Sequence, residues 1–163
     1  EEDGVEPTSA YVREFTHVDY VAATDTHWVI SPPYFWRGRY GPQASLVAKW
    51  QAGKAPRYQV YFYHALNAWA FYEAAADADG MPLEVEFLGR KVGGDGVYEE
   101  RIAAFVPRAA VEAAVDEGIT VYFLGRNNRE RVWLPGYFVE GFLAKADLIY
   151  LDREGPPEGE AGD

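Results

Sequence analysis

Histidine is the first residue type to examine for chemistry, because its imidazole can bind a metal or exchange a proton near neutral pH. The chain has three histidines, His17, His27 and His64, and they come from separate segments. Their spacing matches no zinc signature, and the chain has no cysteine that could complete one. His64 shares its parity with Tyr58 and Phe62 in an alternating run. We therefore expect no zinc site and interpret His64 as a hydrogen-bonded histidine at the edge of the core.

A calcium loop is the second kind of site to test. Asp77, Asp79 and Gly80 match the third, fifth and sixth positions of an EF-hand loop, and Glu86 falls at the twelfth. Ala75 stands at the first position, where a carboxylate is required. A hairpin turn at Asp79-Gly80 explains the segment better, so the sequence predicts no metal ion and no cofactor.

Paired carboxylates could support glycoside hydrolysis, which needs two acids across a cleft. Glu73, Asp95, Glu99 and Glu100 are close enough in the expected topology to be considered together. However, 26 acidic residues in a chain of 163 make such coincidences expected, and Glu99 and Glu100 point to opposite faces of a strand. We assign no catalytic residue and keep a hydrolase as the weakest of three functional alternatives.

The composition indicates a folded acidic chain of one domain. Hydrophobic residues make up 48% of it and aromatic residues 16%, which excludes a disordered chain. The net charge of −11 argues against nucleic acid and anionic membrane surfaces as partners. No apolar run approaches the roughly 20 residues of a membrane span. The chain opens at Glu1 without methionine, which fits either a chain trimmed at its start or a mature protein whose signal peptide has been removed. The aromatic β pattern favours an exported protein, although the cytoplasm stays open.

Residues 57–107 carry the densest aromatic and β-branched pattern, and we expect them to form the core sheet. Both parities of residues 58–64 are largely aromatic, which indicates a strand that is covered on both sides or that keeps an aromatic face for a partner. Residues 65–78 could be strand or helix, with strand favoured by the turn at Asp79-Gly80. The returning strand, residues 83–88, places Leu83, Val85 and Phe87 on one face.

The remaining pattern predicts a mainly β fold, an antiparallel sandwich or barrel-like structure with one or two short helices. Strands are expected at residues 11–21, 26–31, 97–106 and 148–152, a strand or helical turn at 44–50, a hairpin at 119–134 and a short helix at 107–118. Residues 135–147 are ambiguous between helix and loop. We expect one domain over residues 11–152, a flexible acidic arm at 1–10 and a disordered acidic tail at 153–163.

Two segments are the candidate binding surfaces. The loop at residues 31–42 begins with Pro-Pro, ends with Gly-Pro and contains four aromatic residues and two arginines. It either caps the core or presents the binding residues Tyr34, Phe35, Trp36, Arg37, Arg39 and Tyr40. The second segment is the tip of the hairpin, where the basic residues are Arg126, Arg129 and Arg131. The tip is either a solvated turn or a contact for an acidic partner surface.

A family resemblance covers about half of the chain, from residue 57 to residue 146. It is carried by YQVYFYHA, the hairpin that closes at Asp79-Gly80, VYEERIAAFVP, the helix that follows this proline, YFLGRNN and PGYFVEGFL. In the order of these elements the chain resembles small uncharacterised domains of bacterial exported proteins and lipoproteins. The resemblance implies an exported location and a β-rich fold, and it brings no catalytic residue.

These observations favour a non-enzymatic exported domain that acts by protein–protein contact in the bacterial envelope or an extracellular assembly, with another protein or a second copy as its partner. Aromatic residues and arginine are the types that interfaces favour at their centres. The competing hypothesis is a carbohydrate-binding module, because sugars stack their apolar faces on exposed aromatic rings. The rings that could serve this purpose are Trp28, Trp36, Tyr61 and Tyr63.

Overall fold

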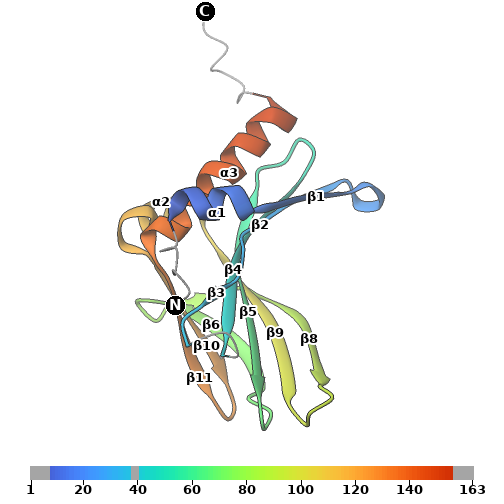
Figure 1. Cartoon of the computed structure of the whole chain (residues 1–163), viewed down its shortest axis with the longest axis vertical. Coiled ribbons are helices and arrows are strands. Elements are labelled where there is room, and N and C mark those ends of the chain that lie inside the picture. Colours follow the sequence, from blue (N-terminus) through green and yellow to red (C-terminus); the bar gives the residue numbers. More distant parts are fainter. Residues whose placement is uncertain (1–7, 38–40, 156–163) are drawn as a thin grey trace, which may run out of the picture.

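A computed structural model describes residues 8–37 and 41–155, which form two antiparallel sheets and three α-helices (Figure 1). The larger sheet has the strand order β1-β2-β4-β5-β9-β8, with the short β3 paired to β4. Its strands are β1 (His17–Val21), β2 (Thr26–Ile30), β3 (Tyr34–Phe35), β4 (Gln43–Gln51), β5 (Arg57–Leu66), β9 (Tyr98–Val106) and β8 (Val85–Val92). The predicted fold class, mainly β with a sandwich-like arrangement, is confirmed.

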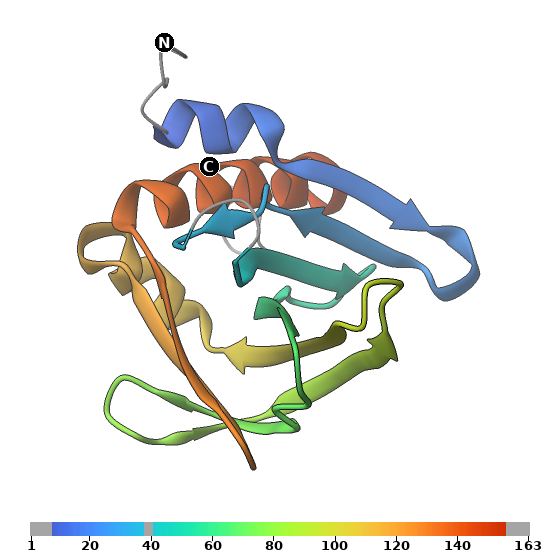
Figure 2. The ribbon, with the colours of Figure 1, turned by 60° about the horizontal axis from the view of Figure 1, so that its bottom comes forward.

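The smaller sheet has the order β11-β10-β6-β7 and packs with the helices on the inner face of the larger sheet (Figure 2). Its strands are β6 (Tyr72–Asp77), β7 (Pro82–Leu83), β10 (Ile119–Gly125) and β11 (Arg129–Leu134), and the helices are α1 (Ser9–Phe15), α2 (Arg108–Glu117) and α3 (Gly136–Glu154). No helix of the described residues combines the length and apolarity that a membrane crossing requires.

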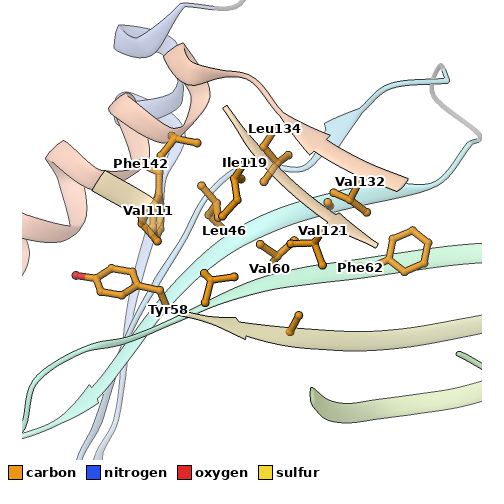
Figure 3. Packing of buried hydrophobic residues seen from close by; sticks show 14 of the residues in the cluster. Leu46, Tyr58, Val60, Phe62, Val111, Ile119, Val121, Val132, Leu134 and Phe142 are labelled. Atoms are coloured by element: carbon orange, nitrogen blue, oxygen red, sulfur yellow. The ribbon is translucent and has the colours of Figure 1, made fainter. Parts of the chain in front are cut away.

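The core forms because one parity of each central strand is apolar. Leu46, Val60 and Phe62 of the larger sheet face Val121 of the smaller sheet and Phe142 of α3 in one buried cluster (Figure 3). Phe62 also stacks on Phe123, with the ring centroids 4.7 Å apart. Burial of these apolar side chains contributes about 1.5–3 kcal/mol each and fixes which face of every strand looks inward.

Several local predictions are confirmed. The helix after Pro107 and the hairpin of β10 and β11 lie where the sequence placed them. Residues 44–50, which could have been strand or helical turn, belong to the strand β4. In the segment 65–78, where strand was favoured over helix, residues 65–66 end β5 and residues 72–77 form β6, while residues 67–71 are neither strand nor helix. The turn after β6 is held by Asp77, whose Oδ1 accepts hydrogen bonds from the backbone N–H groups of Asp79 and Met81, each at 2.9 Å.

The returning strand behaves differently from the prediction. Only Pro82 and Leu83 pair with β6, and the chain then crosses to the larger sheet as β8, which pairs with β9. The common buried face expected for Leu83, Val85 and Phe87 is wrong for Phe87, which is 62% exposed. The physical reason is that β8 is an edge strand, so Phe87 is paired with Ile102 on one side and has no strand of the same sheet on the other.

The helices hold the other corrections. Residues 11–15 were expected to be strand, but they belong to α1, whose N-terminus is capped by the Thr8 side chain. Residues 136–154 are one helix, where the sequence suggested an ambiguous segment and a last strand at 148–152. Gly141 does not break α3 because it lies at the crossing with α1, where a Cβ atom would clash with the Ser9 carbonyl. Tertiary packing therefore outweighs the low helix propensity of glycine here.

The chain termini also need a correction. Arg153 and Glu154 were placed in a disordered tail, but they form the last turn of α3. The Glu154 carboxylate accepts hydrogen bonds from Trp50 Nε1 and from the Gly53 backbone N–H, both at 3.1 Å. Residues 1–7 and 156–163, where the arm and most of the tail were expected, lie outside the described residues.

Candidate functional site

The aromatic loop turns most of its rings toward the core. The Tyr34 ring packs edge-on against Phe138 with the centroids 5.5 Å apart, and the Trp36 ring stacks over Phe62 at 6.2 Å. Phe35, between them, is 39% exposed. Tyr34 and Trp36 therefore cap the core, which was the competing expectation for this loop, and Phe35 is the aromatic side chain left for solvent. Arg39 and Tyr40 lie outside the described residues.

The two predicted binding segments lie side by side. Arg37 donates a hydrogen bond from a terminal guanidinium nitrogen to Glu130 Oε1 at 2.9 Å, and Glu130 is a buried residue of β11. Arg126, at the hairpin tip, pairs with Glu73 at 3.5 Å. Arg129 and Arg131 are exposed on the outward parity of β11. The structure thus joins the loop and the hairpin at one end of the molecule, and their binding role stays a prediction.

A buried carboxylate organises the segment between β5 and β6. Glu100 accepts hydrogen bonds from the backbone N–H groups of Ala70 at 2.9 Å, Phe71 at 3.3 Å and Tyr72 at 3.0 Å. Arg90 Nε donates to the same carboxylate at 3.2 Å. Phe71 has a φ of 55°, a left-handed conformation that costs energy for an aromatic residue. Glu100 therefore supplies acceptors for three consecutive N–H groups of a segment with a strained residue, which indicates a structural role.

His64 and Tyr72 form a second buried polar contact beside Glu100. His64 Nδ1 lies 2.9 Å from the Tyr72 hydroxyl, which accepts a hydrogen bond from Asn128 Nδ2 at 2.7 Å. The hydroxyl donates its own proton to His64 Nδ1 in the tautomer that carries the imidazole proton on Nε2. Burial and, to a smaller extent, the charge of Arg37 lower the pKa of His64 to about 4, although the charge of Glu100 raises it. Burial also raises the pKa of the Tyr72 phenol, so both groups are neutral near pH 7.

The acids considered for hydrolysis are used in separate contacts. Glu73 pairs with Arg126, and Glu100 binds backbone N–H groups in the interior. Glu99 points to the opposite face, where it accepts a hydrogen bond from the Tyr63 hydroxyl and lies 3.4 Å from Lys91 Nζ. The structure does not bring Glu99 and Glu100 across one cleft.

The outer face of the larger sheet gathers a different set of residues. Val47 and Ala103 have no exposed surface, yet they lie outside the main core cluster because their parity is opposite to that of the inner face. Four partly exposed rings surround them, and they belong to Trp28, Tyr61, Tyr63 and Phe105. We call this surface the outer face. The described helices and the smaller sheet lie on its opposite side (Figure 2).

Basic side chains lie over the rings of the outer face. Lys49 Nζ is 5.0 Å from the centroid of Trp28 and 5.5 Å from that of Phe105. The Arg57 guanidinium carbon lies 3.8 Å from the Phe105 centroid, and the Arg101 carbon lies 4.7 Å from the Tyr63 centroid. Such cation–π contacts hold the rings in fixed orientations, so the outer face is preformed.

An ion pair crosses the middle of the outer face. Lys49 Nζ lies 2.9 Å from Glu86 Oε2, although β5 and β9 separate their strands. Three interstrand spacings amount to about 14 Å, so both side chains must lie along the surface to meet. Gln59 lies beneath them and donates from Nε2 to Glu86 Oε2 at 3.4 Å. Burial, with a contribution from the Glu86 charge, raises the pKa of Tyr61 to about 12, which keeps this phenol protonated.

Two hollows lie on the outer face. One, beside Tyr61 and Tyr63, has a volume of about 140 Å³ and includes Gln43, Ser45 and Arg101 in its lining. The other, at the far end of the same face, has a volume of about 530 Å³. Its lining includes Thr24, Thr26, Trp28, Lys49, Lys54 and Arg57. The hydrophobic alternation predicted an aromatic parity on β5, but the register that places Trp28 beside it could not be read from the sequence.

Comparisons of the chain with protein-family models, with curated proteins and with solved structures gave no match. The resemblance to domains of bacterial exported proteins and lipoproteins therefore stays a prediction.

Proposed function

We propose that this chain is a non-catalytic glycan-binding domain that holds its ligand on the outer face of the larger sheet. The observation that carries the proposal is the gathering of Trp28, Tyr61 and Tyr63 on one preformed face that the described helices leave uncovered. These are three of the four rings that the carbohydrate hypothesis singled out. The fourth, Trp36, stacks on Phe62 at the inner side of the sheet.

The chemistry of the outer face suits sugars. A pyranose ring has an apolar face that stacks on an aromatic side chain and a rim of hydroxyl groups that need hydrogen-bond partners. Gln43, Ser45 and Arg101 line the hollow beside the two tyrosines and supply both donors and acceptors. Trp28 and Tyr61 are about 16 Å apart by strand spacing and residue rise, which favours an extended oligosaccharide over a single sugar.

The test compares three alanine variants of partly exposed tyrosines by isothermal titration calorimetry. The ligands are hexasaccharides of cellulose, chitin and xylan, oligogalacturonates, and sulfated carrageenan oligosaccharides. Tyr61→Ala and Tyr63→Ala should each weaken binding about 3- to 10-fold, because one stacked ring contributes about 0.5–1.5 kcal/mol. Tyr122→Ala is the matched control, since Arg129 covers the Tyr122 ring at 4.5 Å on the smaller sheet much as Arg101 covers Tyr63.

The control should bind like the unmodified protein. Equal weakening in all three variants would place the ligand elsewhere, and no heat of binding with any of these oligosaccharides would contradict the proposal. The exported location expected from the sequence is compatible with a glycan ligand and stays a prediction.

Protein–protein contact is the second candidate, and one observation favours it. The strand β11 is at the edge of the smaller sheet, and its outward parity carries Arg129, Arg131 and the 39% exposed Trp133. Arginine and tryptophan are enriched at the centres of interfaces. If a second copy binds there, sedimentation velocity should show a dimer that Trp133→Ala weakens. A monomer at every concentration up to about 100 μM, well above the micromolar Kd of a weak specific pair, would remove self-association.

A further inference from the structure

We infer that the larger hollow of the outer face binds the acidic group of the glycan, a carboxylate or a sulfate ester. This inference rests on the proposed function and specifies its ligand. It goes further because it assigns a charge to the ligand and a place on the sheet where that charge lies.

The residues that line the larger hollow carry positive charge. The chain as a whole has a net charge of −11, but the titratable residues that line this hollow are Lys49, Lys54 and Arg57, with no carboxylate among its described lining residues. Acidic residues outnumber basic ones by 26 to 15 in the chain, so a hollow lined by three cations runs against the overall composition. Local positive charge of this kind attracts and orients an anion.

The lysine and arginine side chains of the larger hollow have N–H groups that remain for a ligand. Lys49 has three N–H groups and gives one to Glu86, and Arg57 has five and gives one to Glu84 at 2.9 Å. Both carboxylates lie outside the lining of the hollow. Lys54 donates to the Gln51 side-chain oxygen at 3.1 Å, which positions its ammonium group at the rim. A carboxylate or sulfate can therefore add to these contacts without displacing an existing ion pair.

An aromatic ring and a positive charge lie close together in the larger hollow. Trp28 lies in the lining next to Lys49, whose ammonium group is 5.0 Å from the Trp28 centroid. An acidic sugar stacked on Trp28 would bring its charged substituent toward Lys49 and Lys54. Thr24 and Thr26 line the same hollow, and their hydroxyl groups can form hydrogen bonds with the hydroxyl groups at the edge of the sugar ring. A bare anion would leave the indole without a partner, which favours a charged sugar over a free inorganic ion.

The experiment uses three probes with related sugar rings: oligogalacturonates, sulfated carrageenan oligosaccharides and neutral galactan oligosaccharides. The unmodified protein should bind at least one acidic probe 10-fold or more tightly than the neutral one at low salt. This preference should shrink as sodium chloride rises, because salt screens exposed charges. The two acidic arms distinguish a carboxylate ligand from a sulfate ester.

Lys54→Gln is the test variant, and Lys91→Gln is its control. Both substitutions remove one positive charge, and Lys91 is on β8 outside the hollow. Lys54→Gln should weaken acidic binding about 3- to 10-fold and leave neutral binding unchanged, and Lys91→Gln should change neither. Circular dichroism of the two variants confirms that both remain folded.

The outcomes separate the two proposals. If neutral and acidic probes bind equally and Tyr61→Ala weakens both, the glycan-binding function stands and the acidic-ligand inference is overturned. If acidic probes bind through Lys54 but Tyr61→Ala and Tyr63→Ala have no effect, the anion site stands and the extended glycan site is overturned. If Lys54→Gln and Lys91→Gln weaken binding equally, only the net charge matters and the inference is overturned.

Discussion

Substitution of Glu100 by alanine tests whether the buried polar contacts are structural. The change removes the acceptor of three backbone N–H groups, those of Ala70, Phe71 and Tyr72. An unsatisfied buried donor costs about 1–3 kcal/mol, so three of them cost about 3–9 kcal/mol, and the 40% exposed Arg90 side chain adds little because water can solvate it. Because the segment around Ala70–Tyr72 can open so that water supplies some of the missing hydrogen bonds, we expect Glu100→Ala to lower the free energy of unfolding by about 3–5 kcal/mol. That is a large part of the 5–15 kcal/mol typical of a domain.

Urea unfolding followed by tryptophan fluorescence measures this loss as a lower midpoint with a similar slope. Glu99→Ala is the matched control, because Glu99 is the adjacent acid on the opposite face and its partner Lys91 is exposed, so water screens their interaction. Glu100→Gln keeps one acceptor oxygen and should lose less than Glu100→Ala. Equal stability of the Glu99 and Glu100 alanine variants would refute the structural role assigned to this carboxylate.

Two further predictions concern stability. The folded chain keeps His64 uncharged down to pH about 4, while the unfolded chain takes up a proton below its ordinary pKa of 6.5. The unfolded state therefore binds more protons between pH 6.5 and 4. As the pH falls through this range, the free energy of unfolding should decrease more steeply for the unmodified protein than for His64→Asn, by up to about 1.4 kcal/mol per pH unit. An identical pH dependence of the two proteins, followed by urea unfolding, would contradict a buried neutral imidazole. Gly141→Ala should cost about 1–3 kcal/mol because its Cβ meets the Ser9 backbone, whereas Gly94→Ala, with open space around it, should cost little. Thermal unfolding that shows the same midpoint for both would refute the close crossing of α1 and α3.

Alternation of apolar residues was enough to predict the fold class. It located β9, β10 and β11 because each of these strands has one parity in the core. It failed for β8, where the edge position leaves Phe87 exposed. It also failed for α3, which is apolar on several sides because α1, α2 and the larger sheet all contact it. Local patterns cannot reveal how many neighbours an element has.

The candidate site was predictable residue by residue but not as a surface. Trp28 and Tyr61 were recognised as possible sugar platforms, but their position on one face of the sheet depends on the pairing of β2 with β4 and of β4 with β5. Lys49 and Glu86 are 37 positions apart, and nothing in their local sequence indicates that they meet. Glu100 carried a signal that could have been used, because it shares the apolar parity of Ile102 and Ala104. A charge at such a position indicates a buried partner.

The glycan-binding proposal depends most on where a ligand binds. NMR measures this directly when the full chain is titrated with each oligosaccharide of the panel and the backbone amide and side-chain signals are followed. We expect the chemical-shift changes to concentrate at the Trp28 indole and at the outward residues of β4 and β5, among them Ser45 and Tyr61. Shifts confined to β10 and β11, or no shifts with any of the oligosaccharides, would contradict it.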